Sequence, residues 1–256
     1  MRKGFVLLAL VLCSGIALSA SAADVTVHFL GHSCYTIETA DGPIVMIDPY
    51  HSYVPYPALP KPADVVLMTH GHIDHCPPCY GEEPWEGDPV VVWPFGDDGN
   101  VLEGTWRIID DLVVRFTEVS HVTASGGGEG LVCVFSFEMG GIRFAHFGDL
   151  GKILTAEQIE IFDGVDVVFL PVGGAYTIDA AEAMTVIAQL PTVKVVFPIH
   201  YYVDGYTPWP DMAPLADFTQ LAGAMYTVRE IDDSEATLNP DTLPRGVEIW
   251  ALEFEE

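Results

Sequence analysis

The strongest constraint on the fold is a polar stretch that directly follows an apolar run. Residues 64–69 read DVVLMT, which is typical of a buried strand, and residues 70–75 read HGHIDH. Three histidines and an aspartate in six residues have little use in packing, because buried polar groups need partners. Side chains alternate along an extended segment, so His70 and His72 point the same way and can bind one ion. The stretch predicts a metal site at the end of a strand.

The same arrangement recurs later in the chain. Three further potential ligands follow β-rich runs: His121 after 113–119, Asp149 after 142–147 and His200 after 195–199. Strand ends that meet at one edge of a sheet are where α/β proteins build their sites. We therefore expect these side chains to surround one cavity together with the 70–75 segment.

Short β-rich runs alternate with turns along the whole chain, and helical segments are few. Expected strands include 25–30, 34–39, 44–47, 65–69, 90–93, 112–119, 131–138, 142–147, 165–170 and 193–198. Expected helices span 156–162, 180–190 and 214–222. Asp179 and Glu182 have the spacing of a capping box at the start of the second helix.

The first 22 residues are predicted to be a signal peptide. Residues 1–3 are basic at two positions, residues 4–17 are apolar, and Ala20–Ala22 supplies small residues for a signal peptidase. The apolar run is shorter than the roughly 20 residues of a membrane span. Cleavage is expected, with an uncleaved anchor as the alternative. One domain, 23–256, would then be exported to the periplasm or secreted, without stable membrane insertion.

Charge and cysteine content limit the partners. The chain has 37 Asp and Glu against 10 Lys and Arg, and such an acidic surface repels phosphate backbones. We therefore expect a small-molecule substrate and no nucleic-acid partner. The sequence carries no signal for an oligomeric state. Cys76 and Cys79 form a CxxC without the second CxxC of a zinc ribbon. A local disulfide is the default in an oxidising compartment, and metal binding is the alternative.

Seven side chains are candidate ligands: His70, His72, Asp74, His75, His121, Asp149 and His200. The first two histidines and His121 supply three nitrogens and leave a fourth position open, as in catalytic zinc sites. Asp74, His75 and His200 are candidates for a second ion, and Asp149 for contact with both. Two ions roughly 3.5–4 Å apart can share a bridging water and make it hydroxide near neutral pH.

This pattern resembles the metallo-β-lactamase superfamily: HxHxDH, a later His, Gly-Asp, and a His after an apolar strand. Other segments resemble the branch that contains ascorbate-6-phosphate lactonase and related hydrolases, namely 30–34, 47–49, 170–177 and 198–201. The resemblance covers nearly the whole chain from residue 23. It implies an α+β fold, a four-layer αββα sandwich, with a dinuclear site at one edge.

The resemblance also implies roles for two residues outside the ligand set. In that branch the Gly-His-Ser turn and the Asp of Asp-Pro approach the metals, and here these are His32 and Asp48. Both are candidate catalytic residues that orient a ligand or relay protons, and a structural role in the turn is the alternative. His28 and His146 lie inside strand patterns, where packing or surface roles are expected.

The expected function is hydrolysis that depends on two divalent ions, zinc first, with manganese or iron as alternatives. A bridging hydroxide would attack an ester, lactone or phosphodiester. Asp149 would hold the hydroxide in line with the bond that breaks, and Asp74 would pass a proton to the leaving group. Lys152 is the only basic residue close to a motif. Two other classes stay open, an iron-dependent oxidoreductase of the same fold and a non-catalytic periplasmic metal-binding protein.

Overall fold

The structure, a computed structural model, describes residues 23–59, 62–109 and 112–254. The expected signal segment 1–22 lies outside the described residues. Among the helices of the described part, none combines the length and apolarity needed to cross a bilayer.

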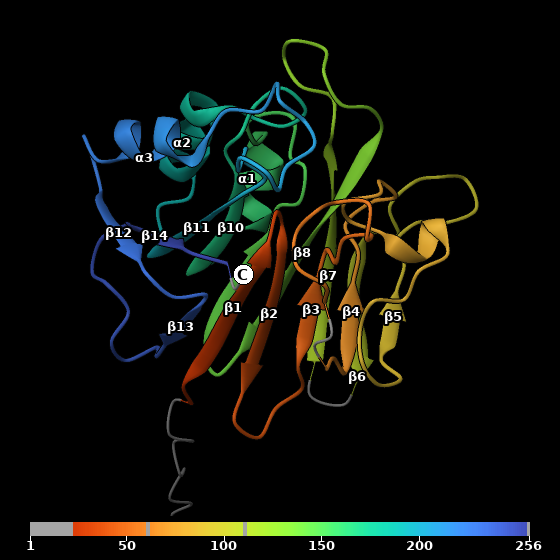
Figure 1. Cartoon of the computed structure of the whole chain (residues 1–256). Coiled ribbons are helices and arrows are strands. Elements are labelled where there is room, and N and C mark those ends of the chain that lie inside the picture. The colour runs from red at the N-terminus through yellow and green to blue at the C-terminus, as the bar shows by residue number, and fades with distance from the viewer. Residues whose placement is uncertain (1–22, 60–61, 110–111, 255–256) are drawn as a thin grey trace, which may run out of the picture.

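Two mixed β-sheets face each other and form the body of the molecule (Figure 1). The six-stranded sheet has the order β13-β1-β2-β3-β4-β5, with the bounds β1 Val25–Gly31, β2 Cys34–Thr39, β3 Val45–Ile47, β4 Val65–Leu67, β5 Val90–Val92 and β13 Glu235–Leu238. The eight-stranded sheet has the order β12-β14-β11-β10-β9-β8-β7-β6, with the bounds β6 Gly104–Ile109, β7 Leu112–Ser120, β8 Leu131–Met139, β9 Ile142–His146, β10 Val167–Pro171, β11 Val195–Ile199, β12 Thr227–Ile231 and β14 Glu248–Leu252.

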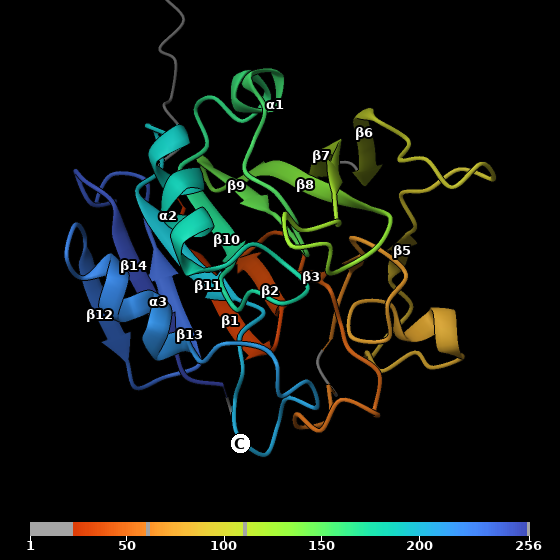
Figure 2. The same ribbon diagram turned by 90° about the horizontal axis from the view of Figure 1, so that it is seen from above.

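The helices of the described residues are short: α1 Ala156–Ile161, α2 Ala180–Gln189 and α3 Leu215–Ala222, with one 3-10 turn, η1, at Pro77–Tyr80. Seen from above, α1 and α2 lie on the side of the eight-stranded sheet that faces away from β1 and β2 (Figure 2). The predicted capping box of α2 is confirmed. The Asp179 carboxylate accepts from the Glu182 amide, and the Glu182 carboxylate accepts from the Asp179 amide.

The core between the sheets follows from alternation along buried strands. In β4, Val65 and Leu67 join the large core, while Val66 joins a smaller cluster on the other face of the sheet. Aromatic rings link the two sheets at the centre. The Phe169 ring of β10 lies 4.5 Å from the Tyr35 ring of β2 and 5.2 Å from the Phe197 ring of β11, measured between centroids.

The expected α+β sandwich is confirmed, and loops supply part of its outer layer. Tyr50, Tyr56 and Leu59 are buried in the same cluster as Met46 and Val66, and so cover the outer face of the six-stranded sheet. The Tyr50 hydroxyl lies within hydrogen-bonding distance of two backbone carbonyls, at 2.7 and 2.8 Å. A segment that contains several prolines can therefore cover this face without a helix of its own.

The expected strands and helices all occur, with ends shifted by a few residues. Four strands were missing from the expected set: β6, β12, β13 and β14. β6 and β12 are edge strands without a buried residue, and β13 is a short edge strand with two exposed residues. Such strands do not show the apolar pattern by which strands are recognised.

Replacement of Phe169 tests whether this aromatic contact holds the sheets together. Phe169→Ala should lower the free energy of unfolding by about 3–5 kcal/mol, because the side chain is fully buried between the sheets. Urea unfolding followed by circular dichroism measures the change. Val113→Ala, at a β7 position that is 40% exposed, should cost less than about 0.5 kcal/mol. Equal losses in the two variants would contradict this account of the core.

Candidate metal centre

The candidate ligands lie together at one end of the sandwich, on segments from both sheets. The 70–75 segment follows β4, whereas His121 follows β7 and His200 follows β11. The structure gathers eight side chains into two clusters, within each of which the potential ligand atoms lie no more than 4.8 Å apart. The first cluster is His70, His72, His121 and Asp149, and the second cluster is His32, Asp74, His75 and His200.

The first cluster unites the three histidines that the sequence grouped together with Asp149. The Nε2 atoms of His70 and His121 lie 3.6 and 3.2 Å from Oδ2 of Asp149. His72 presents its Nδ1 atom, 3.0 Å from Nε2 of His70. Three ring nitrogens and one carboxylate oxygen thus face a common point, which is the donor set of a zinc, manganese or iron site.

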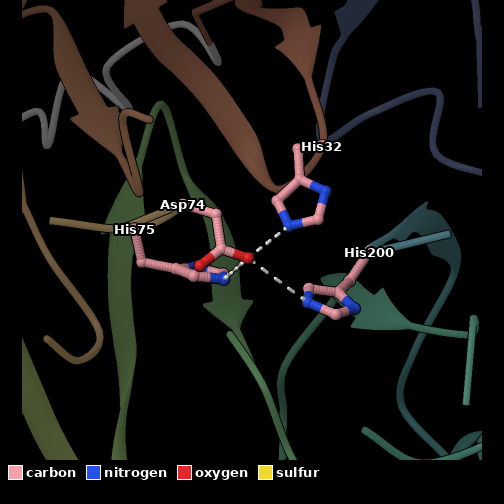
Figure 3. Close-up of side chains that lie close together, drawn as sticks. All are labelled: His32, Asp74, His75 and His200. Atoms are coloured by element: carbon pink, nitrogen blue, oxygen red, sulfur yellow. Dashed lines mark hydrogen bonds and ion pairs between the residues drawn. The ribbon is translucent and has the colours of Figure 1, made fainter. Parts of the chain in front are cut away.

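The second cluster contains the three expected ligands and, in addition, His32. Figure 3 shows the Asp74 carboxylate among three imidazole rings. Asp74 Oδ2 lies 2.9 Å from Nε2 of His32, 3.5 Å from Nε2 of His75 and 3.8 Å from Nε2 of His200. His32 comes from the turn between β1 and β2, so this cluster joins the six-stranded sheet to the end of β11. The position of His32 makes it a potential ligand rather than a distant orienting group.

Asp149 lies between the two clusters and contacts both. Its Oδ1 atom lies 3.1 Å from Nε2 of His75, and its Oδ2 atom lies 3.2 Å from Nε2 of His200. The same Oδ2 atom is the one nearest to His121. A carboxylate in this position can bridge two cations, one in each cluster.

Buried polar atoms in the clusters are consistent with bound cations. His75 Nε2, His121 Nε2 and Asp149 Oδ1 are buried and have no hydrogen-bond partner of acceptable geometry. Such atoms cost free energy unless another group satisfies them. Both nitrogens lie close to the Asp149 carboxylate, at 3.1 and 3.2 Å, and a divalent cation would satisfy nitrogen and oxygen donors alike. The residues present therefore fit a metal centre.

The pKa shifts in the clusters show how the buried charges balance one another. Burial lowers the pKa of His70 well below its usual value, which keeps its imidazole neutral, the form that binds metals. Burial alone would also lower the pKa of His200, but Asp149 and Asp74 outweigh it and raise that pKa to about 9. Burial would raise the pKa of Asp149, but His200 and His75 hold it well below its usual value. Protonated imidazoles thus neutralise the buried carboxylates where no cation does.

Asp48 holds His75 in place from outside the clusters. Its Oδ1 accepts from the Thr69 amide at 2.7 Å, and its Oδ2 accepts from the Thr69 hydroxyl at 2.8 Å and from Nδ1 of His75 at 2.9 Å. The last bond leaves Nε2 of His75 directed at the clusters. Asp48 is fully buried and lines no described cavity of the centre, so its place is that of a positioning residue.

Backbone strain concentrates at this centre. His32, Asp48 and His200 all adopt left-handed conformations, with φ values of 54°, 49° and 53°. Each such residue costs about 1–2 kcal/mol, so the surrounding structure must hold it. The His200 amide donates to the His32 carbonyl at 3.1 Å, which ties the two strained turns to each other.

The remaining sequence candidates lie outside the clusters. His28 is 3.3 Å from Glu235 on the strand beside it, and His146 is buried, with Nε2 2.9 Å from the Ser33 carbonyl. Packing and surface roles were expected for both. Cys76 and Cys79 form a disulfide directly after His75, as the default interpretation predicted.

A cavity of about 400 Å³ opens onto both clusters. Tyr80, Tyr176 and Trp209 form part of its wall, together with residues of both clusters and of the glycine-rich 125–130 segment. Gly128 has to be glycine, because a Cβ atom there would overlap the His121 carbonyl oxygen. Tyr80 reaches the wall from the end of η1, a 3-10 turn that the sequence analysis did not predict.

Comparisons with known proteins agree with this geometry. The profile of the beta-lactamase superfamily domain matches residues 26–200. A protein of Methanoregula boonei named as a metal-dependent hydrolase is 31% identical over 191 residues, which are 68% of this chain and 80% of that protein. A relative of the same name from Carboxydothermus hydrogenoformans is 27% identical over 73% of this chain and 87% of its own length.

Among solved structures, one from Thermotoga maritima is described as a zinc-dependent hydrolase of the metallo-beta-lactamase superfamily. It is 27% identical, superposes with a TM-score of 0.69, and covers 90% of this chain and 100% of its own.

Loss of the Asp48 charge should weaken metal binding. We expect Asp48→Asn to lower the affinity for zinc by about 10–100-fold, because His75 loses the carboxylate that orients it. Competition with a chelating dye measures the affinity, and elemental analysis gives the number of ions bound. Asp64→Asn is the matched control, since Asp64 accepts from the Ile44 amide at an exposed site. Equal affinities in wild type and Asp48→Asn would refute the positioning role.

Proposed function

We propose that this chain, a metal-dependent hydrolase that belongs to the metallo-β-lactamase superfamily, uses two metal ions. The bond that it hydrolyses would be that of an ester, lactone or phosphodiester. One observation carries the dinuclear proposal. The Asp149 carboxylate lies 3.1 to 3.2 Å from ring nitrogens of both clusters, so one buried residue serves two adjacent sets of ligands.

The first cluster would hold one ion and the second cluster the other. Bound divalent cations lower the pKa of water and polarise a carbonyl or phosphoryl oxygen, which is the chemistry that hydrolysis needs. Zinc fits the nitrogen-rich donor set best, with manganese or iron as the alternatives. Cys76 and Cys79 do not compete as ligands, because they are joined to each other.

The protein's own residues hold the reactants and move the proton. Asp149 and Asp74 both line the cavity, so their carboxylates face the space in which a substrate binds. Oδ2 of Asp74 faces the histidine nitrogens of the second cluster, so the other carboxylate oxygen, Oδ1, is the atom that would accept a proton from the attacking water and return it to the leaving group. Where no ion is bound, the 2.9 Å contact between Nε2 of His32 and Oδ2 orients this carboxylate. Trp209 and Tyr176 line the cavity and exclude water from part of it.

Asp149→Asn tests the shared carboxylate. The variant should lower kcat/KM for 4-nitrophenyl esters by about 100-fold or more, because it removes the charge on which both clusters depend. Stopped-flow absorbance gives the rate, and elemental analysis of the same samples should show fewer ions per chain. Asp163→Asn is the control, since Asp163 is exposed and lies outside the clusters.

The two other function classes have separate outcomes in this experiment. Iron in the native protein together with oxygen consumption and no ester cleavage would identify an oxidoreductase. Bound metal without turnover of any ester, lactone or phosphodiester would identify a metal-binding protein. Either result would overturn the hydrolytic proposal.

We also propose that the protein is exported. Support comes from the basic, apolar and small-residue pattern of residues 1–22 and from the Cys76–Cys79 disulfide, a bond that persists in oxidising compartments. Protein recovered from the periplasm or medium of the native host should have the intact mass of a chain that begins near Ala23. A chain that stays in the cytosol with its first 22 residues attached would contradict the proposal.

A further inference from the structure

A second cavity adjoins the metal centre, and Trp209 does not line it. It is an open groove of about 630 Å³ that begins at His70 and His72 and runs along the 93–99 segment. His72 and Glu129 line both this groove and the cavity of the metal centre. A molecule bound at the ions can therefore extend into the groove past these two side chains.

Strand pairing explains why the groove lies beside the ligands. β5 runs parallel to β4, with Val92 next to Leu67, so both strands end at the same edge of the sheet. β4 continues into the 70–75 segment, and β5 continues into Trp93. The ring of Trp93 lies against Gly71, where an added Cβ would approach its Cη2 atom to 3.3 Å.

The wall of the groove is aromatic and incompletely covered. Trp93 and Phe95 lie with their ring centroids 5.1 Å apart, and both line the groove. Trp93 is 43% exposed, although a residue of this size is usually packed. An exposed indole beside a metal centre offers a surface for an apolar chain or a ring.

Charge restricts what can occupy the groove. Its charged groups, apart from the histidines, are the carboxylates of Asp97 and Glu129. Among the described residues, no lysine or arginine lines either this groove or the cavity of the metal centre. A phosphate or carboxylate group in the groove would meet like charges and no cationic partner, whereas an uncharged group would meet no such penalty.

We propose that the groove is the subsite for the uncharged, apolar part of the substrate, that Trp93 determines this specificity, and that the substrates are neutral esters or lactones with an apolar or aromatic arm. This inference rests on the proposed function and narrows it. In the reaction, the oxygen of one water forms a bond to the acyl carbon, and the bond from that carbon to the alkoxy oxygen breaks. The leaving alkoxide takes a proton from the water.

Binding of ketones that cannot be hydrolysed tests the subsite without turnover. Ligand-observed NMR on the metal-loaded protein should show 4-phenyl-2-butanone binding about tenfold more tightly than 2-butanone. Trp93→Ala should remove that difference. Trp106→Ala should keep it, because Trp106 is 48% exposed and lies outside the groove. The ring-phosphorylated ketone, 4-(4-phosphonooxyphenyl)-2-butanone, should bind more weakly than its parent. Tighter binding of the phosphorylated probe, or a phenyl preference that survives Trp93→Ala, would overturn the proposal.

Kinetics separate failure of the subsite from failure of the hydrolase proposal. The kcat/KM for methyl 4-phenylbutyrate should be about tenfold higher than that for methyl butyrate. In Trp93→Ala the two values should be equal. Cleavage of both esters at equal rates by wild type and Trp93→Ala would refute the subsite and leave the hydrolase standing. If neither ester is cleaved while phenyl binding still depends on Trp93, the subsite stands and the ester hydrolase is refuted.

Discussion

The buried carboxylate of Asp149 is the interaction on which the rest of the site depends. It contacts ring nitrogens of His75, His121 and His200, which come from three distant parts of the chain. Repulsion among these imidazoles and the cost of burying a charge both fall when the carboxylate lies between them. A negative group thus occupies the point at which several strand ends of the sandwich meet.

Hydrogen bonds other than the contacts with Asp149 keep the ligands in this arrangement. Asp48 fixes the ring of His75, and the Glu129 carbonyl, 2.9 Å from Nδ1 of His121, fixes that ring with Nε2 toward the first cluster. His32 and His200 are held in left-handed conformations by a hydrogen bond between their turns. The ligands are thus positioned by the fold before any ion binds, which limits the reorganisation that binding requires.

Local spacing made much of this site predictable from the sequence. His70 and His72 meet in the first cluster as expected, although residues 69–72 form bends and not the extended segment assumed from the sequence. His121, Asp149 and His200 each follow a recognisable apolar strand. The entry of His32 into the second cluster could not be predicted in this way, since it depends on a positive φ and a bond to a residue 168 positions later. Trp93 was missed for a similar reason, because only the pairing of β5 with β4 places it beside Gly71.

Net charge connects the site to its substrates. The chain carries a formal charge of −27, whereas the centre would hold cations. At physiological ionic strength the field of a charge reaches about 8 Å into solution, so an approaching anionic substrate would meet the carboxylates of the exterior before it met cations held at the clusters. Asp97 and Glu129 extend that exterior into the groove beside the clusters. An uncharged ester crosses this field without opposition, and its carbonyl oxygen becomes strongly polarised only inside the cavity. Selection of neutral substrates is therefore a consequence of where the charges lie.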